Sequence, residues 1–197
     1  LGYYSNGLSK IGEAGDFITA PEISPLFSQA LGNHIADILR QLPAADCLEF
    51  GAGNGQMAVD ILQYLQEIDC LPAHYYIIEA SAHLRQQQYE IIHKLFGSDQ
   101  NRVIWLDQLP TEFTGVIIAN EVCDAMPVHR VQFEENQILE VGVGREEGQL
   151  AWLSQTVTDP FLQTRCEQIH PLLPQFPYQT EVAMQAPAWL GTIAEKL

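Results

Sequence analysis

The sequence predicts an α/β protein built on a parallel, Rossmann-like sheet, and three observations lead to this prediction. Short apolar segments alternate with helical patterns between residues 43 and 127. A glycine turn, GAGNG at residues 51–55, joins the first of these strands to a helix. Beyond Pro127 the pattern changes to hairpins, VHRVQFEE, QILEVGVGRE and QLAWLSQTV. Regular alternation is typical of a doubly wound sheet, so we expect such a core followed by an antiparallel β insertion.

Residues 1–42 are expected to form a loop and one helix that covers the core. Residues 1–20 are rich in glycine and polar side chains, which predicts a long loop. Ser24 and Pro25 suit the N-cap and first position of a helix, and apolar residues then recur at helical spacing. His34 falls within that apolar stripe, so we expect a packed core histidine rather than a ligand.

Residues 43–127 are expected to form the α/β core. Strands are predicted at residues 47–50, 74–79, 102–106 and 115–119, and helices at 57–68 and 81–96. The last strand is wholly apolar, as expected of a central parallel strand covered on both faces.

Residues 128–197 are expected to form a third region on the substrate side. Three hairpin strands are followed by a proline-rich stretch, residues 170–181, and then by a last helix. The buried residues predicted for this helix are Val182, Met184, Trp189, Leu190 and Ile193.

The composition narrows the classes of partner. The 197 residues include 25 acidic and 9 basic side chains, for a formal net charge of −16. Such a chain repels phosphate backbones and attracts cations, so no nucleic-acid partner is expected. No apolar run is long enough for membrane insertion.

The four cysteines are widely spaced, which predicts reduced thiols in a cytoplasm-like compartment and no metal site. The sequence carries no signal of oligomeric state.

The glycine turn is the strongest candidate for a ligand site. Gly51, Gly53 and Gly55, with Ala52 between them, follow a strand that carries an acidic residue, Glu49, near its end. Glycine lets a backbone approach a ligand closely, and the helix start supplies unpaired N–H groups. A dinucleotide fingerprint needs a third glycine at position 56, where this chain has Gln. A tight connection without any ligand remains an alternative.

Acidic residues at the ends of the next two strands support a nucleoside ligand. Glu79 can accept hydrogen bonds from both ribose hydroxyls, which fits S-adenosylmethionine and NAD equally. Asp107 could accept the adenine amino group, with Leu106 among the apolar side chains around the ring. Ala80 is predicted to line the same site. Ligands of such sheets bind outside the carboxyl ends of the strands.

The loop after the fourth strand is predicted to face a substrate. Asn120 begins it, and Glu121 and Asp124 could together grip a guanidinium through charge-assisted hydrogen bonds. An ordinary capped loop after a strand is an equally good interpretation of these three residues.

Four segments make the chain resemble the MidA family. They are GYY at residues 2–4, GDFITAPEISPLF at 15–27, EFGAGNG at 49–55 and NEVCDAMPVHR at 120–130. MidA proteins are bacterial and mitochondrial relatives of the arginine methyltransferase that assists the assembly of respiratory complex I. Their cellular place would be the bacterial cytoplasm, or the mitochondrion for the eukaryotic members.

The resemblance implies a class I methyltransferase fold with S-adenosylmethionine as methyl donor and a protein arginine as substrate. For the mitochondrial members that arginine lies on a complex I subunit. Residues 15–17 and 19–22, with Thr19, Pro21 and Glu22 among them, would close over the cofactor beside the glycine turn. Asn120, Glu121 and Asp124 would border the methyl-transfer site. That fold has seven strands where four are predicted here, so we expect it to be incomplete on its C-terminal side.

Two other functions compete with a methyltransferase. A catalytically silent scaffold would keep the fold and act in assembly by docking a partner. A nicotinamide oxidoreductase is disfavoured by Gln56 and by the lack of a hydride-transfer partner.

Overall fold

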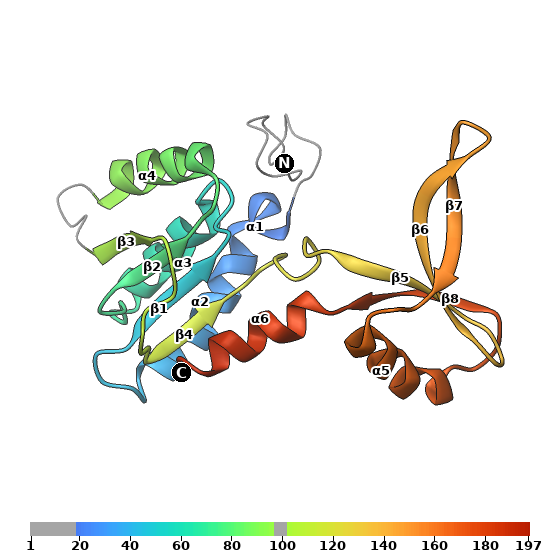
Figure 1. Cartoon of the computed structure of the whole chain (residues 1–197). Coiled ribbons are helices and arrows are strands. Elements are labelled where there is room, and N and C mark those ends of the chain that lie inside the picture. The colour runs from blue at the N-terminus through green and yellow to red at the C-terminus, as the bar shows by residue number, and fades with distance from the viewer. Residues whose placement is uncertain (1–18, 97–101) are drawn as a thin grey trace. The chain divides into compact units, whose positions relative to one another are not determined.

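The computed structural model describes residues 19–96 and 102–197, which form two compact units (Figure 1). One unit runs to Val122 and includes Ile193–Leu197, and the other comprises Cys123–Thr192. The GYY motif and Gly15–Phe17 lie outside the described residues. The three-part division predicted from the sequence stays a prediction.

The first unit contains a parallel α/β sheet, which confirms the predicted fold class. Its described elements are α1 (Ala20–Ile23), α2 (Pro25–Leu39), β1 (Asp46–Phe50), α3 (Gln56–Glu67), β2 (Tyr75–Ile78), α4 (Ala82–Phe96), β3 (Val103–Leu106) and β4 (Gly115–Ile118). The strands are parallel in the order β3-β2-β1-β4. Each strand and helix predicted for residues 43–127 lies within two residues of the observed one.

β4 differs from its prediction because it lies at the edge of the described sheet, beside β1 alone. The inner strand with the most complete burial is β1, in which Cys47–Phe50 are all buried. An apolar sequence does not separate a central strand from an edge strand, since both can be covered by helices. Gly115 begins β4 with φ +148°, and a Cβ there would collide with the Asp46 carbonyl.

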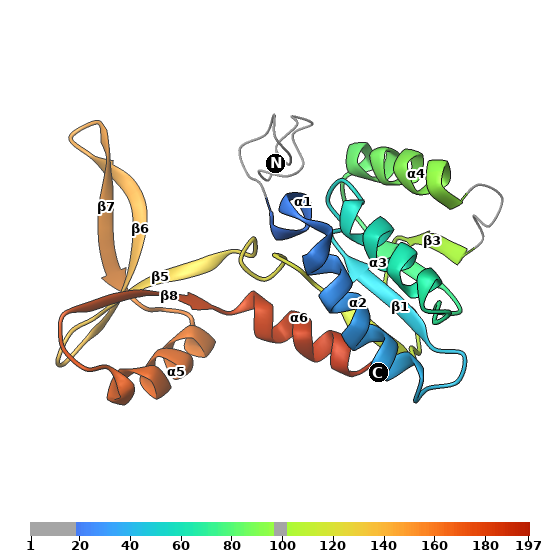
Figure 2. The same ribbon diagram turned by 180° about the vertical axis from the view of Figure 1, so that it is seen from behind.

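Three helices share one hydrophobic core with alternate residues of the strands. Ile35 of α2, Leu65 of α3 and Ile92 of α4 pack in the cluster that also contains Cys47 and Tyr75. Because side chains alternate along a strand, these helices cover one face of the sheet. Figure 2 shows α2 and α3 lying across β1.

α2 begins as predicted but buries a different face. The Ser24 hydroxyl accepts a hydrogen bond from the Leu26 amide at 3.2 Å, which confirms the N-cap. The prediction for His34 is wrong, because its side chain is exposed. The buried residues are mostly small: Ser28, Gly32, Ile35 and Ala36.

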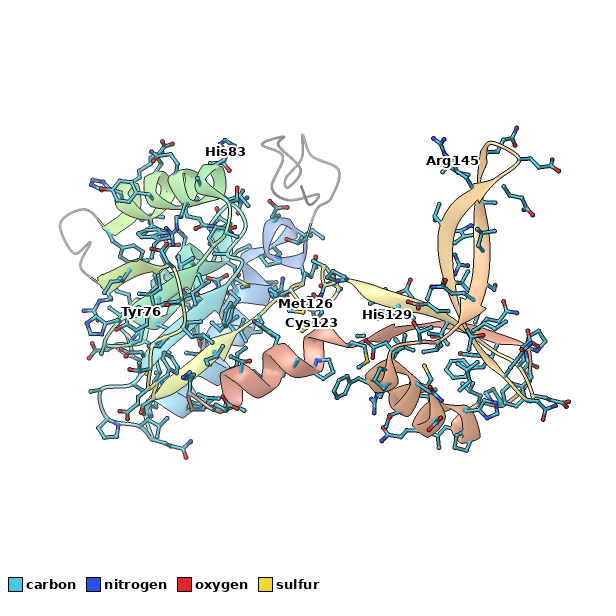
Figure 3. All side chains as sticks on the ribbon, in the orientation of Figure 1. Tyr76, His83, Cys123, Met126, His129 and Arg145 are labelled. Atoms are coloured by element: carbon cyan, nitrogen blue, oxygen red, sulfur yellow. The ribbon has the colours of Figure 1, made fainter. Side chains whose placement is uncertain are left out.

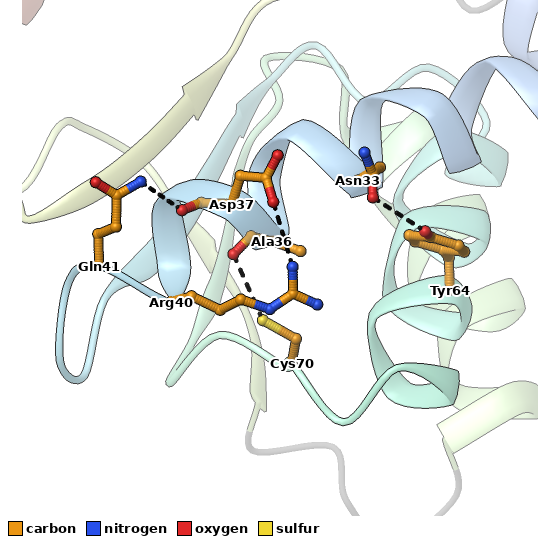
Figure 4. Close-up of polar contacts among 7 residues, drawn as sticks. All are labelled: Asn33, Ala36, Asp37, Arg40, Gln41, Tyr64 and Cys70. Carbon is orange, nitrogen blue, oxygen red and sulfur yellow. Dashed lines mark hydrogen bonds and ion pairs between the residues drawn. The ribbon is translucent and has the colours of Figure 1, made fainter.

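Gly32 explains why the small face of α2 is the buried one. A Cβ at this position would lie 2.8 Å from Cδ1 of Tyr64 in α3, so the two helices approach closely only because Gly32 has no side chain. At the edge of the contact the Tyr64 hydroxyl donates to Asn33 at 3.4 Å (Figure 4). The larger apolar side chains of Ile23 and Leu26 remain 74% and 70% exposed.

The second unit is an antiparallel sheet with a covering helix. Its elements are β5 (Val128–Phe133), β6 (Ile138–Glu146), β7 (Gln149–Thr156), α5 (Pro160–Ile169), a 3-10 turn η3 (His170–Leu172) and β8 (Tyr178–Ala183), followed by α6 (Gln185–Ala194). The strand order is β7-β6-β5-β8. Arg145 lies near the tip of the β6–β7 hairpin (Figure 3). The core of this unit consists of Val131, Phe133, Val157, Leu162, Cys166 and Val182.

The hairpin prediction is confirmed, whereas the region after it differs from its prediction. β8 pairs with β5, so Val182 is buried as a strand residue and not as part of the last helix. α5 was not predicted, although Asp159 and Pro160 form a helix start in which the carboxylate accepts from the Phe161 and Leu162 amides. Leu190 was predicted to be buried but is 53% exposed. No helix in the described ranges combines the length and apolar character that a membrane crossing requires.

Candidate functional site

The glycine turn between β1 and α3 adopts a backbone that favours glycine at all three positions. Gly51, Gly53 and Gly55 have φ values of +62°, +57° and +91°. Gly55 is also crowded, since a Cβ there would lie 3.1 Å from Ile91 and 3.2 Å from the Cα of Gln88. The turn therefore needs glycine both for its conformation and for the close packing of α4.

α1 is tied to this turn by a side-chain contact. Asn54 donates from its amide nitrogen to Glu22 at 2.7 Å, and the second Glu22 oxygen accepts from the Thr19 amide at 3.3 Å. Pro21 is buried. The structure thus brings Thr19 and Pro21 to the vicinity of the glycine turn through Glu22, which belongs to the same segment.

Glu49 is a buried carboxyl group with one unpaired oxygen. Its Oε2 accepts a hydrogen bond from the Tyr75 hydroxyl at 2.7 Å, and its Oε1 has no partner. Burial raises the pKa of Glu49 to about 7, against the lowering effect of the Tyr75 hydrogen bond. The same burial, with Glu49 beside it, raises the pKa of the Tyr75 hydroxyl. A lone buried acceptor of this kind suits a donor group on a ligand.

Glu79 lies just beyond β2 and is connected to the glycine turn. One of its oxygens accepts from the Ser81 amide at 2.9 Å, and the other accepts from the side chain of Gln88 at 3.2 Å. The same Gln88 nitrogen donates to the Gly53 carbonyl at 2.8 Å. The ends of β1 and β2 are therefore joined through one amide group. Ala80 beside Glu79 is exposed.

Gln88 is the residue that our sequence analysis missed. Its side chain is fully buried, and its oxygen accepts from the Trp105 indole of β3 at 3.0 Å. No signal in the sequence points to this role, because glutamine within a polar helix is typical of a solvated face.

Asp107 lies just beyond β3 and faces outward. Its side chain is 89% exposed and pairs with Arg85 of α4 at 2.8 Å. Arg85 also donates to the carbonyl of Leu106 at 2.6 Å. Leu106 itself is half-buried. This arrangement leaves the predicted contact of Asp107 with an adenine ring as a prediction.

The loop after β4 begins next to the glycine turn. A Cβ on Gly51 would lie 3.5 Å from the side chain of Val122, so the loop and the turn are in contact. Asn120 is half-buried, whereas Glu121 is exposed and has a left-handed backbone with φ +52°. Such a conformation in a residue other than glycine is uncommon and is often found at functional sites.

Asp124 is also exposed, but it belongs to the second unit, which begins at Cys123. Cys123 and Met126 lie in the stretch that leads to β5 (Figure 3). The binding of one guanidinium by both carboxylates, Glu121 and Asp124, stays a prediction. The described residues contain no group of His, Cys, Asp or Glu that could hold a metal ion.

The parallel sheet and the glycine turn define a Rossmann-like protein, and acidic residues lie near the ends of β1, β2 and β3. A family model described as "Putative S-adenosyl-L-methionine-dependent methyltransferase" matches residues 30–197. The chain belongs to this family, which confirms the resemblance seen in its motifs and the expected class of cofactor.

The relatives and similar structures agree with this family. The mitochondrial protein arginine methyltransferase NDUFAF7 of Danio rerio is 29% identical over 72% of this chain and 39% of its own length. The Drosophila melanogaster homologue is 28% identical over 71% and 37%. A protein of Burkholderia thailandensis, crystallised with S-adenosyl-homocysteine, is 34% identical with a TM-score of 0.88. That structure is matched by 100% of this chain, which spans 51% of the bacterial protein.

Proposed function

We propose that this chain supplies the cofactor site of an S-adenosylmethionine-dependent methyltransferase that acts on arginine in a protein substrate. The observation that carries the proposal is the hydrogen-bonded connection from the Gly53 carbonyl through Gln88 to Glu79. It brings the acceptors expected for an amino-acid tail and for a ribose to the ends of neighbouring strands, where ligands of such sheets bind.

The side chains at this site fit the cofactor in their chemistry. The unpaired Oε1 of Glu49 can accept from the ammonium of the tail, beside the backbone of Gly51 and Gly53. Glu79 can accept from the ribose hydroxyls, while Leu106 and Asp107 lie beyond β3 on the adenine side. When bound, the cofactor supplies an already activated methyl group, so the protein mainly orients the reactants.

Two features support arginine as the substrate. They are the loop after β4 and the net charge of the chain. Glu121 would orient a guanidinium, with Asn120 and Asp124 beside it, because carboxylates bind this group through paired hydrogen bonds. The net charge of −16 attracts cationic segments to the protein. The NDUFAF7 relatives are named protein arginine methyltransferases, which supports arginine as the proposed target. The resemblance to the MidA family leads us to propose a respiratory complex I subunit as the protein that carries it.

Calorimetric titration of the full chain with S-adenosyl-homocysteine tests the cofactor site. We expect saturable binding that weakens by roughly tenfold or more in Glu79→Ala, since a charged acceptor is lost. Glu112→Ala removes an exposed carboxylate outside the site and should bind like the wild type. Absence of binding to the wild type would contradict the proposal.

Transfer is tested by incubating the chain with labelled S-adenosylmethionine and arginine peptides. Label should enter arginine, and Glu121→Gln should reduce the rate while S-adenosyl-homocysteine affinity stays unchanged. Binding without transfer would favour the docking role of a silent scaffold.

We also propose the bacterial cytoplasm as the place of action. The four cysteines, Cys47, Cys70, Cys123 and Cys166, are all free thiols, as expected in a reducing compartment. The NDUFAF7 relatives are named mitochondrial, which applies to those proteins.

A further inference from the structure

Gln88 occupies an unusual place for an amide side chain. It projects from α4 and is fully buried, next to a core cluster that contains Ile92 and is contacted by Ile91 and Trp105. An apolar side chain of similar volume would fill this space without needing polar partners. Packing alone therefore does not explain why this position is a glutamine.

The hydrogen bonds of Gln88 use its whole amide group. The nitrogen donates to the Gly53 carbonyl at 2.8 Å and to Glu79 at 3.2 Å, and the oxygen accepts from Trp105 at 3.0 Å. An indole N–H can only donate, so it must face the amide oxygen. That contact fixes the orientation of the amide and directs both of its donors to the glycine turn and to Glu79.

The consequence for Glu79 is a carboxylate held at both oxygens. The Ser81 amide binds Oε1 at 2.9 Å, and Gln88 binds Oε2. Each oxygen keeps further acceptor capacity, because a carboxylate has about four lone-pair sites. A carboxylate held in this way presents two acceptors side by side, which is what the vicinal hydroxyls of a ribose require.

We propose that Gln88 is a positioning residue that holds Glu79 and the Gly53 carbonyl in the arrangement needed to bind the ribose of a nucleoside cofactor. The inference rests on the proposed function, but it concerns a residue that would not touch the cofactor itself. Gln88 acts through Glu79, so its effect should depend on the ribose hydroxyls of the ligand.

Two ligands measure this dependence in the 197-residue chain. One is S-adenosyl-homocysteine, and the other is its 2′,3′-dideoxy analogue, which lacks both hydroxyls. The wild type should prefer the first ligand, and Gln88→Met should reduce this preference by about tenfold, because Glu79 loses the hydrogen bond that orients it toward the ribose hydroxyls. A merely structural defect would weaken both ligands equally and leave the preference unchanged.

The matched control is Gln86→Met, which makes the same change at an exposed position of the same helix. It should keep the wild-type preference. Gln88→Glu serves as a second variant if Gln88→Met does not fold, since it keeps the size and the acceptor for Trp105. It places a carboxylate against Glu79 and should also lose the preference.

The outcomes separate this inference from the proposed function. A wild type that does not bind S-adenosyl-homocysteine overturns both. A wild type that binds it, with an unchanged preference in the folded Gln88 variants, overturns the positioning role alone. Loss of the preference in these variants with retention in Gln86→Met supports it.

Discussion

Among the carboxyl groups of the described residues, Glu49 is the one whose pKa is raised most strongly by folding. It is buried at β1 with one paired and one unpaired oxygen, and its pKa rises from 4.5 to about 7. The folded chain therefore retains a proton that the unfolded chain releases between these two values. Stability from this group is complete below about pH 4.5 and is lost as the pH rises through about 7.

Replacing Glu49 by Gln should remove this pH dependence. Above pH 7 the charged form costs the wild type roughly 3 kcal/mol, because each pKa unit corresponds to about 1.4 kcal/mol. Glu49→Gln should thus gain stability relative to the wild type between pH 5 and pH 8, as measured by urea unfolding at several pH values. Glu112→Gln, an exposed control, should parallel the wild type. If the free energy of unfolding changes with pH in the same way in Glu49→Gln and in the wild type, ionisation of Glu49 does not destabilise the folded chain.

Gly55 should tolerate no side chain. With φ +91° and contacts of 3.1 and 3.2 Å to an added Cβ, Gly55→Ala is expected to lose about 1–3 kcal/mol in urea unfolding. Gly142→Ala is the control, because nothing lies within 4 Å of its added Cβ. A loss of similar size in both variants would refute the strain argument.

The residues of the site differ in how far the sequence alone predicts them. The glycine turn was predicted because positive φ and close approach leave a local signature. The role of Gln88 was not predicted, because it depends on hydrogen bonds to residues that are distant in the sequence, namely Gly53, Glu79 and Trp105. Asp107 was named from its place after a strand, but its pairing with Arg85 comes from α4, which the local pattern does not reveal.

At the scale of elements, α1 is joined to the glycine turn by a side-chain hydrogen bond. Its four residues are too few for independent helix stability, so the Glu22–Asn54 hydrogen bond at 2.7 Å, the burial of Pro21 and the packing on α2 and α3 hold it in place. Helix existence was predictable where periodicity was long, as in α3 and α4. The short α1 was missed, and β8 was misassigned because its pairing with β5 is non-local.

Asn54→Asp should release α1 from the turn, because it sets a carboxylate against Glu22 and removes the donor. Hydrogen exchange of the Glu22 and Ile23 amides should become several-fold faster. Asn33→Asp is the control in the same unit, since its retained oxygen can still accept from Tyr64. Unchanged exchange in Asn54→Asp would mean that other contacts hold α1.

At the scale of the whole molecule, the chain has two units with separate hydrophobic cores. One core centres on β1 and α3, and the other on β5 and α5. The change of sequence pattern beyond Pro127 predicted this contrast in architecture. Units with separate cores can unfold in separate steps. In that case a single unfolding midpoint does not describe the stability of the chain.

Leu162→Ala should therefore destabilise the second unit alone. Leu162 is fully buried there, and its truncation should cost about 2–5 kcal/mol. Calorimetric scans should show one transition moved to lower temperature and the other unchanged. Leu65→Ala, an equally buried leucine of the first unit, should move the other transition. A common shift of both transitions would indicate that the units unfold together.

The position of Trp105 offers a way to follow ligand binding in solution by tryptophan fluorescence. Its indole N–H donates to Gln88, one hydrogen bond away from Glu79, so the emission of this ring responds to the polarity around the acidic end of β2. A chain in which Trp152 and Trp189 are replaced by Phe would retain Trp105 as its one tryptophan. The protein then carries its own optical reporter, and occupancy of the proposed cofactor site can be followed without attaching a dye.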